Sequence, residues 1–366
     1  MRPSRRFWKG KRVFLTGHTG FKGSWLSLWL QRLGAELVGL SNGVPTSPSL
    51  FEVAGVAREM ISLEGDVRDR NRLRAELEAA RPHIVIHMAA QALVQRSLRD
   101  PVATYSTNVM GTVNVLEAIR AVEDVRVVLN VTSDKCYRNR GEGHAFREDD
   151  PLGGTDPYSS SKACAELVTE AYRESFFRSR GPHQVRIASA RAGNVIGGGD
   201  WAPHRLVPDV MTAALEGRAA ALRHPRSLRP WQHVLNPLDG YLLLAERLWG
   251  HGALASAWNF GPVGTDVRSV RWVAERLAEL WDGGIRLDEQ ETSDRREATT
   301  LELDPSRARS ELGWRPCWNL DVGLEKVASW YRSFAAGEDM RIVTLAEISE
   351  YEEQARTIGV AAGRTR

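Results

Sequence analysis

Three glycines that follow the first apolar run of the chain constrain its fold more than any other feature. Gly17, Gly20 and Gly23 separate residues 12–16, which are predicted to form a buried strand, from residues 24–33, whose apolar spacing is that of a helix. A tight turn between a strand and a helix lets the backbone come close to a pyrophosphate, whose charge the N-terminus of the helix receives. A plain glycine-rich turn is the alternative. The flanking strand and helix favour a turn that binds a dinucleotide.

Residues that follow a later predicted strand, 83–87, are expected to line the same ligand. The small side chains of Ala89 and Ala90 let the chain pass close to a ribose and a nicotinamide. Asn108 lies early in an amphipathic segment, residues 104–122, and is expected either to contribute to this site or to have a structural role in which it bridges backbone groups. The predicted dinucleotide-binding residues are Gly17, His18, Thr19, Gly20, Phe21, Gly23, Asp66, Val67, Ala89, Ala90, Gln91, Asn108, Tyr158 and Lys162.

The second strand, predicted at residues 36–40, bears on which dinucleotide binds. An acidic residue usually follows this strand and contacts the adenosine ribose. Here residues 41–43 are Ser-Asn-Gly, and no arginine for a 2′-phosphate follows them, so the sequence favours NAD over NADP. Asp66 and Val67, which end the next segment, are candidates for the adenine. Asp66 is equally suited to cap a helix over residues 70–80.

Tyr158 and Lys162 form the predicted catalytic pair. Four residues apart, they project from the same face of a helix. An ammonium beside a phenol stabilises the phenolate, so Lys162 is expected to lower the pKa of Tyr158 from about 10 towards neutrality. Tyr158 is then a base for a sugar or alcohol hydroxyl. A tyrosine and a lysine four residues apart occur often by chance. The pair indicates a catalytic role here because the same chain carries a dinucleotide-binding turn.

Strands and helices alternate along the first half of the chain. This alternation predicts an α/β fold with a doubly wound parallel sheet of the Rossmann type, which we assign to residues 1–191. After Arg191, glycine and proline become frequent, and residues 192–340 are predicted to form a smaller substrate-binding lobe that is partly interleaved with the sheet. Residues 341–366 are expected to form a peripheral helix and a tail.

Composition excludes several classes of protein. The 366 residues, 42% hydrophobic and 26% charged, are those of an ordinary globular protein, and a net charge of +3 provides no strong field for nucleic acid or a membrane. No run approaches the roughly 20 apolar residues of a membrane span, and the basic N-terminus lacks the core of a signal peptide. Three widely spaced cysteines and no ligand-like set of His, Asp or Glu predict a cytoplasmic protein without disulfides or a bound metal.

Several motifs together resemble a known family. The glycine-rich turn, Ser133-Asp134, the Tyr-Ser-Ser-Ser-Lys run at 158–162 and Arg-Ala-Gly-Asn-Val at 191–195 resemble the extended short-chain dehydrogenases/reductases that epimerise or dehydrate sugar nucleotides. The likeness covers residues 11 to about 335. Residues 132–137 (Thr-Ser-Asp-Lys-Cys-Tyr) and 229–234 (Arg-Pro-Trp-Gln-His-Val) most resemble the branch that acts on CDP-glucose.

The resemblance implies a lyase that removes water by an internal redox cycle for deoxysugar biosynthesis. In such a cycle Tyr158, assisted by Lys162, takes the proton of the glucose 4-hydroxyl while hydride passes to NAD. Ser133 hydrogen-bonds the 4-oxygen, and Asp134 donates a proton to the departing 6-hydroxyl. Hydride then returns to C6 and gives a 4-keto-6-deoxy sugar. The residues that the resemblance implies for substrate binding are Asn194, Arg205, Arg229 and Arg296.

Lys135 departs from the related dTDP-glucose dehydratases, which carry a glutamate at its position. A lysine acts as the base for C5 only when its amine is neutral, which burial and nearby positive charges favour. The alternative is a lysine that pairs with Asp134 and only orients it. The CDP-glucose branch is the reason for assigning Lys135 as the base.

Other readings remain open at this point. A different nucleotide-sugar 4,6-dehydratase or a 4-epimerase keeps Tyr158 and Lys162, but an epimerase does not need Asp134 and Lys135. A non-catalytic dinucleotide sensor or scaffold is the alternative outside enzymes. The resemblance also implies a homodimer or homotetramer formed through residues 104–122 and 158–177.

Overall fold

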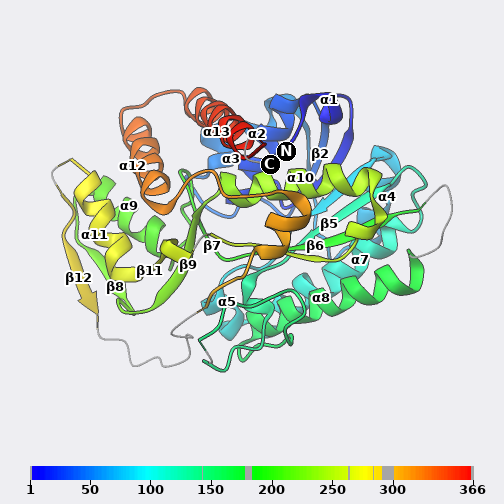
Figure 1. The fold of residues 1–366 in the computed structure, drawn as a ribbon, viewed down its shortest axis with the longest axis horizontal. Helices are drawn as coiled ribbons and strands as arrows, with labels where there is room; N and C mark the ends of the chain where they lie inside the picture. Colours follow the sequence, from blue (N-terminus) through cyan, green and yellow to red (C-terminus); the bar gives the residue numbers. More distant parts are fainter. Residues whose placement is uncertain are drawn as a thin grey trace.

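A seven-stranded parallel sheet forms the centre of the molecule (Figure 1). The computed structural model describes residues 2–141, 143–177, 184–262, 264–282, 284–290 and 301–363. The strand order is β10-β6-β5-β4-β1-β2-β3, and every neighbouring pair is parallel. The strands are β1 (Arg12–Thr16), β2 (Glu36–Ser41), β3 (Ile61–Glu64), β4 (Ile84–His87), β5 (Val127–Val131), β6 (Arg186–Ala192) and β10 (Ala257–Phe260). The predicted doubly wound α/β fold is therefore confirmed.

Helices cover both faces of this sheet. The helices are α2 (Phe21–Leu33) and α10 (Leu235–Gly250) on one face, and α4 (Arg70–Ala80), α7 (Gly111–Ile119) and α8 (Pro157–Phe176) on the other. Consecutive residues of β1 alternate between the two cores, since Val13 and Leu15 lie in one hydrophobic cluster and Phe14 in the other. A strand that is buried on both faces has no polar face, which explains the unbroken apolar runs in the sequence.

Shorter segments connect the main elements. The amphipathic segment that carries Asn108 is not one regular helix, because α6 (Pro101–Tyr105) passes through a π-helical turn, η2 (Ser106–Met110), before α7 begins. The remaining short helices are α1 (Arg5–Trp8), α3 (Leu50–Val53), η1 (Val56–Glu59), α5 (Val94–Arg99), η3 (Asp134–Cys136), η4 (Gly252–Leu254), η5 (Gly264–Asp266) and η6 (Ala308–Leu312).

A smaller lobe projects beyond the carboxyl ends of the central strands. It contains a three-stranded sheet of β7 (Asn194–Ile196), β9 (Leu228–His233) and β11 (Val267–Ser269), and a parallel pair of β8 (Ala220–Arg223) and β12 (Leu287–Gln290). Its helices are α9 (Leu206–Leu215), α11 (Val270–Leu280) and α12 (Leu320–Ala335). The chain returns to the main sheet between these elements, through α10 and β10.

The last helix, α13 (Met340–Gly363), packs against α2 and is more than a peripheral addition. Met340, Ile348 and Tyr351 on it are at most 3% exposed, and Glu352 accepts a hydrogen bond of 2.8 Å from the Trp29 indole. Near the N-terminus, Arg2 donates a 3.2 Å hydrogen bond to the Ala355 carbonyl on α13. No helix among the described residues combines the length and apolar character that crossing a bilayer requires.

Candidate active site

A large cleft lies between the carboxyl edge of the central sheet and the smaller lobe. Its volume is about 1490 Å³. This exceeds the roughly 300–1,000 Å³ of a site for one drug-sized ligand, so the cleft has room for two ligands side by side. Residues from the glycine-rich turn, from the ends of β2, β4 and β5, from α8 and from the loop after β7 line it.

The glycine-rich turn is built so that side chains are excluded from it. Gly17 has a φ of +80°, and a Cβ there would lie 2.7 Å from the Ala89 backbone nitrogen. A Cβ at Gly23 would lie 2.1 Å from the Gly17 carbonyl oxygen. Gly20 caps α2 without a side-chain hydrogen bond, which leaves amide donors of the first helical turn available to an anion in the cleft. The turn therefore fits a pyrophosphate.

His18 belongs to this turn, but its side chain points away from the cleft. The imidazole is fully buried, with Nε2 2.7 Å from the Ser62 hydroxyl and Nδ1 3.0 Å from that of Ser41. Burial lowers the pKa of His18 to about 4. The prediction that His18 contacts the dinucleotide is not met by its side chain, because the turn directs it towards β2 and β3. Thr19, Gly20 and Phe21 do line the cleft.

Asn108 hydrogen-bonds the backbone of Gln91 and does not itself line the cleft. Its side chain accepts a 2.8 Å hydrogen bond from the Gln91 amide and donates one of 3.0 Å to the Gln91 carbonyl. It also donates to the Ser161 hydroxyl, at 2.8 Å. Ala89, Ala90 and Gln91 line the cleft, whereas Asn108 lies behind them. The second of the two expected roles, bridging of backbone groups, is the one that the structure gives to Asn108.

Asp66 lines the cleft and is not a helix cap. It accepts a 2.8 Å hydrogen bond from Asn42 and forms a 2.6 Å ion pair with Arg68. The cap of α4 is Asp69, which accepts a hydrogen bond of 3.0 Å from the Arg72 amide. Hydrogen bonds from Arg68 hold the pKa of Asp66 below its ordinary value. Asp66 and Val67 both line the cleft.

Ser133, Asp134 and Lys135 follow β5 in the short helix η3. Ser133 caps this helix, donates a 2.9 Å hydrogen bond to Asp134 Oδ1 and accepts one from the Lys135 amide. Asp134 is 3% exposed, and its Oδ2 has no hydrogen-bond partner within the described part of the chain. Burial raises the pKa of Asp134, although the positive charge of Lys135 opposes the shift. Removal from water therefore disfavours the charged form of this carboxyl group.

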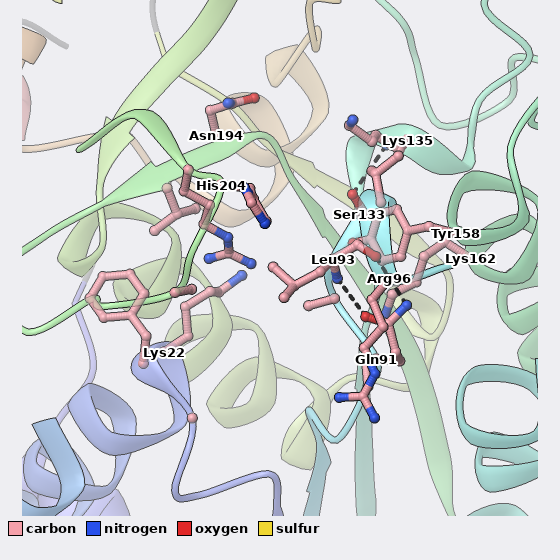
Figure 2. Close-up of a pocket in the computed structure, with 18 of the residues that line it drawn as sticks. Lys22, Gln91, Leu93, Arg96, Ser133, Lys135, Tyr158, Lys162, Asn194 and His204 are labelled. Carbon is pink, nitrogen blue, oxygen red and sulfur yellow. Dashed lines mark hydrogen bonds between the residues drawn. The ribbon is translucent and has the colours of Figure 1, made fainter. Parts of the chain in front are cut away.

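Tyr158 and Lys162 lie on the first turns of α8 and share a wall of the cleft with Ser133 (Figure 2). Burial raises the pKa of Tyr158 to about 12, although a hydrogen bond with Ser133 opposes this shift. Burial also lowers the pKa of Lys162 to about 8, against the charge of Glu166. Removal from water disfavours both phenolate and ammonium. The pKa of Tyr158 is therefore raised where the sequence predicted a fall, because burial outweighs the hydrogen bond with Ser133 and the positive charge of Arg205.

Lys22 is a cleft residue that sequence reasoning did not single out. It lies between Gly20 and Gly23, faces the cleft opposite Tyr158 in Figure 2, and donates a 3.2 Å hydrogen bond to the Tyr241 hydroxyl. Burial lowers the pKa of Lys22 to about 7, and the positive charges of Lys162 and Arg205 add to the shift. A lysine inside a glycine-rich turn is the sequence signal that could have identified it.

Three of the four predicted substrate-binding residues come together on the lobe side of the cleft. Asn194 begins β7, Arg205 caps α9 and Arg229 lies in β9, and all three line the cleft. Asp200 holds Arg205 through an ion pair of 3.3 Å. Arg229 is 5% exposed, and its charge also acts on Asp134. The fourth, Arg296, lies outside the described residues.

No cluster of three or more His, Cys, Asp or Glu with the geometry to hold a metal occurs in the described ranges.

A tyrosine and a lysine one helical turn apart, facing a dinucleotide-type turn across one cleft, place this molecule among the extended short-chain dehydrogenases/reductases. The chain belongs to the GDP-mannose 4,6 dehydratase family, whose model matches residues 14–327. It is 49% identical over 352 residues to the CDP-glucose 4,6-dehydratase of Salmonella typhimurium, an alignment that covers 95% of this chain and 98% of that one. It is 26% identical to a dTDP-glucose 4,6-dehydratase of Xanthomonas campestris pv. campestris, over 87% of this chain and 92% of the relative.

Solved structures share the fold. The epimerase Mth375 of Methanothermobacter thermautotrophicus superimposes with a TM-score of 0.77 at 22% identity, covering 91% of this chain and 95% of that chain. The dTDP-glucose 4,6-dehydratase of Bacillus anthracis, solved in complex with NAD, gives 0.73 at 21% identity, covering 88% and 97%. At these identities the similarity establishes the architecture, which is common to epimerases and dehydratases.

Proposed function

We propose that this protein is an NAD-dependent hydro-lyase that converts CDP-D-glucose to CDP-4-dehydro-6-deoxy-D-glucose. The observation that carries the proposal is the position of Ser133, Asp134 and Lys135 beside Tyr158 in one cleft. An epimerase or a simple reductase needs only the tyrosine and lysine, whereas loss of water needs an additional acid and base. The 49% identity to a CDP-glucose 4,6-dehydratase supports the choice of nucleotide.

The cleft fits NAD by its shape and its donors. The turn around Gly17 and Gly23 admits no side chains, and the N-terminus of α2 offers amide donors for the pyrophosphate. Asp66 and Val67 would hold the adenosine, and Ala89, Ala90 and Gln91 the ribose and nicotinamide. Bound NAD supplies the hydride acceptor for the first step and the hydride donor for the last.

The roles of the side chains follow from their environments. Tyr158 accepts the proton of the sugar 4-hydroxyl, and the positive charge of Arg205 favours the phenolate, as Lys162 does when it is protonated. Ser133 hydrogen-bonds the 4-oxygen, and the new C4 ketone acidifies the C5–H bond. Asp134, whose pKa burial raises, donates a proton to the 6-hydroxyl as it leaves as water. Hydride delivery to C6 and a proton at C5 complete the 4-keto-6-deoxy sugar.

Lys135 is proposed as the base that removes the C5 proton. It is partly buried, follows Asp134 directly and lines the cleft. We expect Lys135→Ala to exchange hydride at C4 but to stall before water is lost, because the C5 proton has no acceptor. Deuterium uptake at C5 from solvent measures this step. Uptake at the wild-type rate would assign Lys135 to the orientation of Asp134 instead.

The decisive experiment incubates the purified protein with NAD and CDP-glucose and follows the alkali-induced absorbance of a 4-keto-6-deoxy sugar. GDP-, UDP- and dTDP-glucose are the matched controls for the nucleotide. An epimer without a ketone would reject dehydration in favour of a 4-epimerase. Tight NAD binding without turnover of any of these nucleotide sugars would favour a dinucleotide sensor or scaffold.

We also propose that the enzyme works as a homo-oligomer in the cytoplasm. Large apolar side chains are exposed on α6, η2 and α8, which pack side by side. These residues are Val102, Tyr105, Met110, Leu167 and Phe176. An apolar surface shared by neighbouring helices suits burial against a second copy. The three cysteines are free thiols, which supports a reducing compartment.

A further inference from the structure

A buried ion pair between Glu166 and Arg191 lies directly behind the reacting side chains. The Glu166 carboxylate is 2.8 Å from the Arg191 guanidinium, and the two side chains are 3% and 4% exposed. Glu166 lies on α8, one turn beyond Lys162, and Arg191 lies near the end of β6. Burial opposes ionisation of Glu166, yet the charge of Arg191 and hydrogen bonds hold its pKa below the ordinary value.

Each residue of this pair hydrogen-bonds one end of the segment 132–137, which carries Asp134 and Lys135. Glu166 Oε1 accepts a short hydrogen bond from the hydroxyl of Thr132, the residue before Ser133. Arg191 donates a 2.7 Å hydrogen bond to the hydroxyl of Tyr137, two residues after Lys135, and also lies over the Tyr137 ring at 4.9 Å from its centroid. The segment 132–137 is therefore held at both ends.

Further hydrogen bonds fix the pair itself. Ser189 on β6 donates a 2.6 Å hydrogen bond to Glu166 Oε2. The Tyr137 hydroxyl donates one of 2.7 Å to Asn259 on β10, whose own amide hydrogen-bonds Glu148. Three neighbouring strands and α8 thus converge on two buried charges. Both carboxylate oxygens of Glu166 and two of the three guanidinium nitrogens of Arg191 are hydrogen-bonded, and only Nε of Arg191 lacks a partner among the described residues. A buried network in which nearly every group is hydrogen-bonded resists displacement.

We propose that the Glu166–Arg191 pair is a positioning device that keeps residues 133–135 in register with Tyr158 and Lys162. Oxidation at C4 requires the tyrosine and lysine of α8, whereas loss of water requires Asp134 and Lys135, which follow β5. The pair connects these two sets of groups through Thr132 and Tyr137. The pair contributes more to water loss than to oxidation at C4, because Asp134 and Lys135 both lie on the held segment, whereas of the groups that act at C4 only Ser133 does. The inference rests on the proposed function.

The test removes the connections and leaves the ion pair intact. Glu166→Gln and Arg191→Met would each leave the other member of the pair as a buried charge without its partner, which risks misfolding. Thr132→Val and Tyr137→Phe delete one hydroxyl each and keep the shape of the side chain. The matched controls are Thr169→Val and Tyr172→Phe on the same helix. Thr169 accepts a 2.7 Å hydrogen bond from Asn130 on β5, and Tyr172 donates one of 2.8 Å to Glu117, both away from the cleft.

Two readouts separate positioning from general stability. The first is the ratio of C5 deuterium uptake to C4 oxidation with CDP-glucose, which we expect to fall about tenfold in Thr132→Val and Tyr137→Phe, since small misplacements of reacting groups have effects of this order. The second is amide hydrogen exchange over residues 132–137 in protein without coenzyme or substrate, which we expect to accelerate in these variants. The controls are expected to leave both unchanged.

The outcomes distinguish this inference from the proposed function. If the wild-type protein does not dehydrate CDP-glucose, the proposed function fails, and the hydrogen-exchange comparison still decides whether the pair holds residues 132–137. If the wild type is active and the variants keep its ratio, or if the controls change that ratio equally, the positioning role is overturned. A lower melting temperature with an unchanged ratio would also assign the pair to stability alone.

Discussion

Burial changes the acid–base chemistry of the cleft residues in two opposite directions. It raises the pKa values of Tyr158 and Asp134, and it lowers those of Lys22 and Lys162. The physical cause is the same in each case, because a low-dielectric site disfavours whichever form is charged. Burial in the cleft therefore makes ionisation of each of these side chains less favourable than it is in water.

At the residue scale, we expect Tyr158→Phe to lose hydride transfer by a factor of about 10²–10⁴, the contribution of a well-placed general base. Only the phenolic oxygen is removed, so NAD affinity should stay close to the wild-type value. Single-turnover oxidation of CDP-glucose and calorimetric titration of NAD measure the two properties. Wild-type turnover in this variant would show that another group takes the proton.

The buried Lys22 side chain is expected to make the free energy of unfolding depend on pH. Its pKa of about 7 in the folded protein is below the ordinary 10.5, so the unfolded chain binds more protons between these values, and this residue's contribution to the unfolding free energy rises with pH in that window. Lys22→Met removes this effect. We expect the variant to be more stable than wild type by about 1–2 kcal/mol at pH 6, with a smaller advantage near pH 10. An advantage that is the same at both pH values, measured by urea unfolding, would contradict the shifted pKa.

At the scale of elements, glycine in the turn between β1 and α2 is required by contacts and not only by a backbone angle. Gly17 adopts a positive φ, whereas Gly23 is helical and is kept small because the Gly17 carbonyl occupies the place of a Cβ. Close packing of the turn onto the helix is what brings the amide donors to the cleft. The turn and the first turn of α2 therefore form one unit.

We expect Gly23→Ala to destabilise the protein by about 1–3 kcal/mol or more, because its Cβ would lie 2.1 Å from a backbone oxygen and the turn must shift. NAD affinity should fall as the amide donors move. Thermal unfolding without ligand and titration with NAD test the two effects. Gly250→Ala at the end of α10 is the control, since a Cβ at that position would meet nothing within 4 Å and stability should change little. Equal behaviour of the two variants would contradict the argument.

At the scale of the whole molecule, the surface of α6, η2 and α8 is the part of the fold most suited to a second copy. Met110 and Leu167 are 52% and 54% exposed there. The cleft lies at the carboxyl edge of the sheet, and these helices cover a face of it. Association through them would bury the apolar side chains and leave the cleft open.

We expect the wild-type protein to sediment as a dimer or tetramer, and the double variant Met110→Glu/Leu167→Glu to sediment as a monomer, because two carboxylates per copy would be buried in the interface. Analytical ultracentrifugation at micromolar concentration makes the comparison. Ile342→Glu on α13, at a residue 67% exposed, is the control and should keep the wild-type state. A monomeric wild type would refute the proposed interface.

Periodicity and glycine spacing in the sequence were sufficient for the parallel sheet, the dinucleotide-type turn and the Tyr158–Lys162 pair, because each depends on neighbours along the chain. The strands predicted at residues 36–40 and 83–87 match β2 and β4 to within one residue at each end, since they too depend on local apolar runs. The smaller lobe was harder, since β10 and α10 return to the main sheet after a long excursion. Long-range pairing of this kind leaves no local pattern in the residues.

What the sequence determined by itself was the identity and local spacing of the reacting groups. Only the tertiary structure decided their environment: it turned His18 away from the cleft and Lys22 into it, placed Asn108 behind Gln91, and raised the pKa of Tyr158 where the sequence predicted a fall. Local spacing reflects helix and strand geometry, which neighbouring residues set. Burial and charge depend on segments far apart in the chain, and these meet only when the protein has folded.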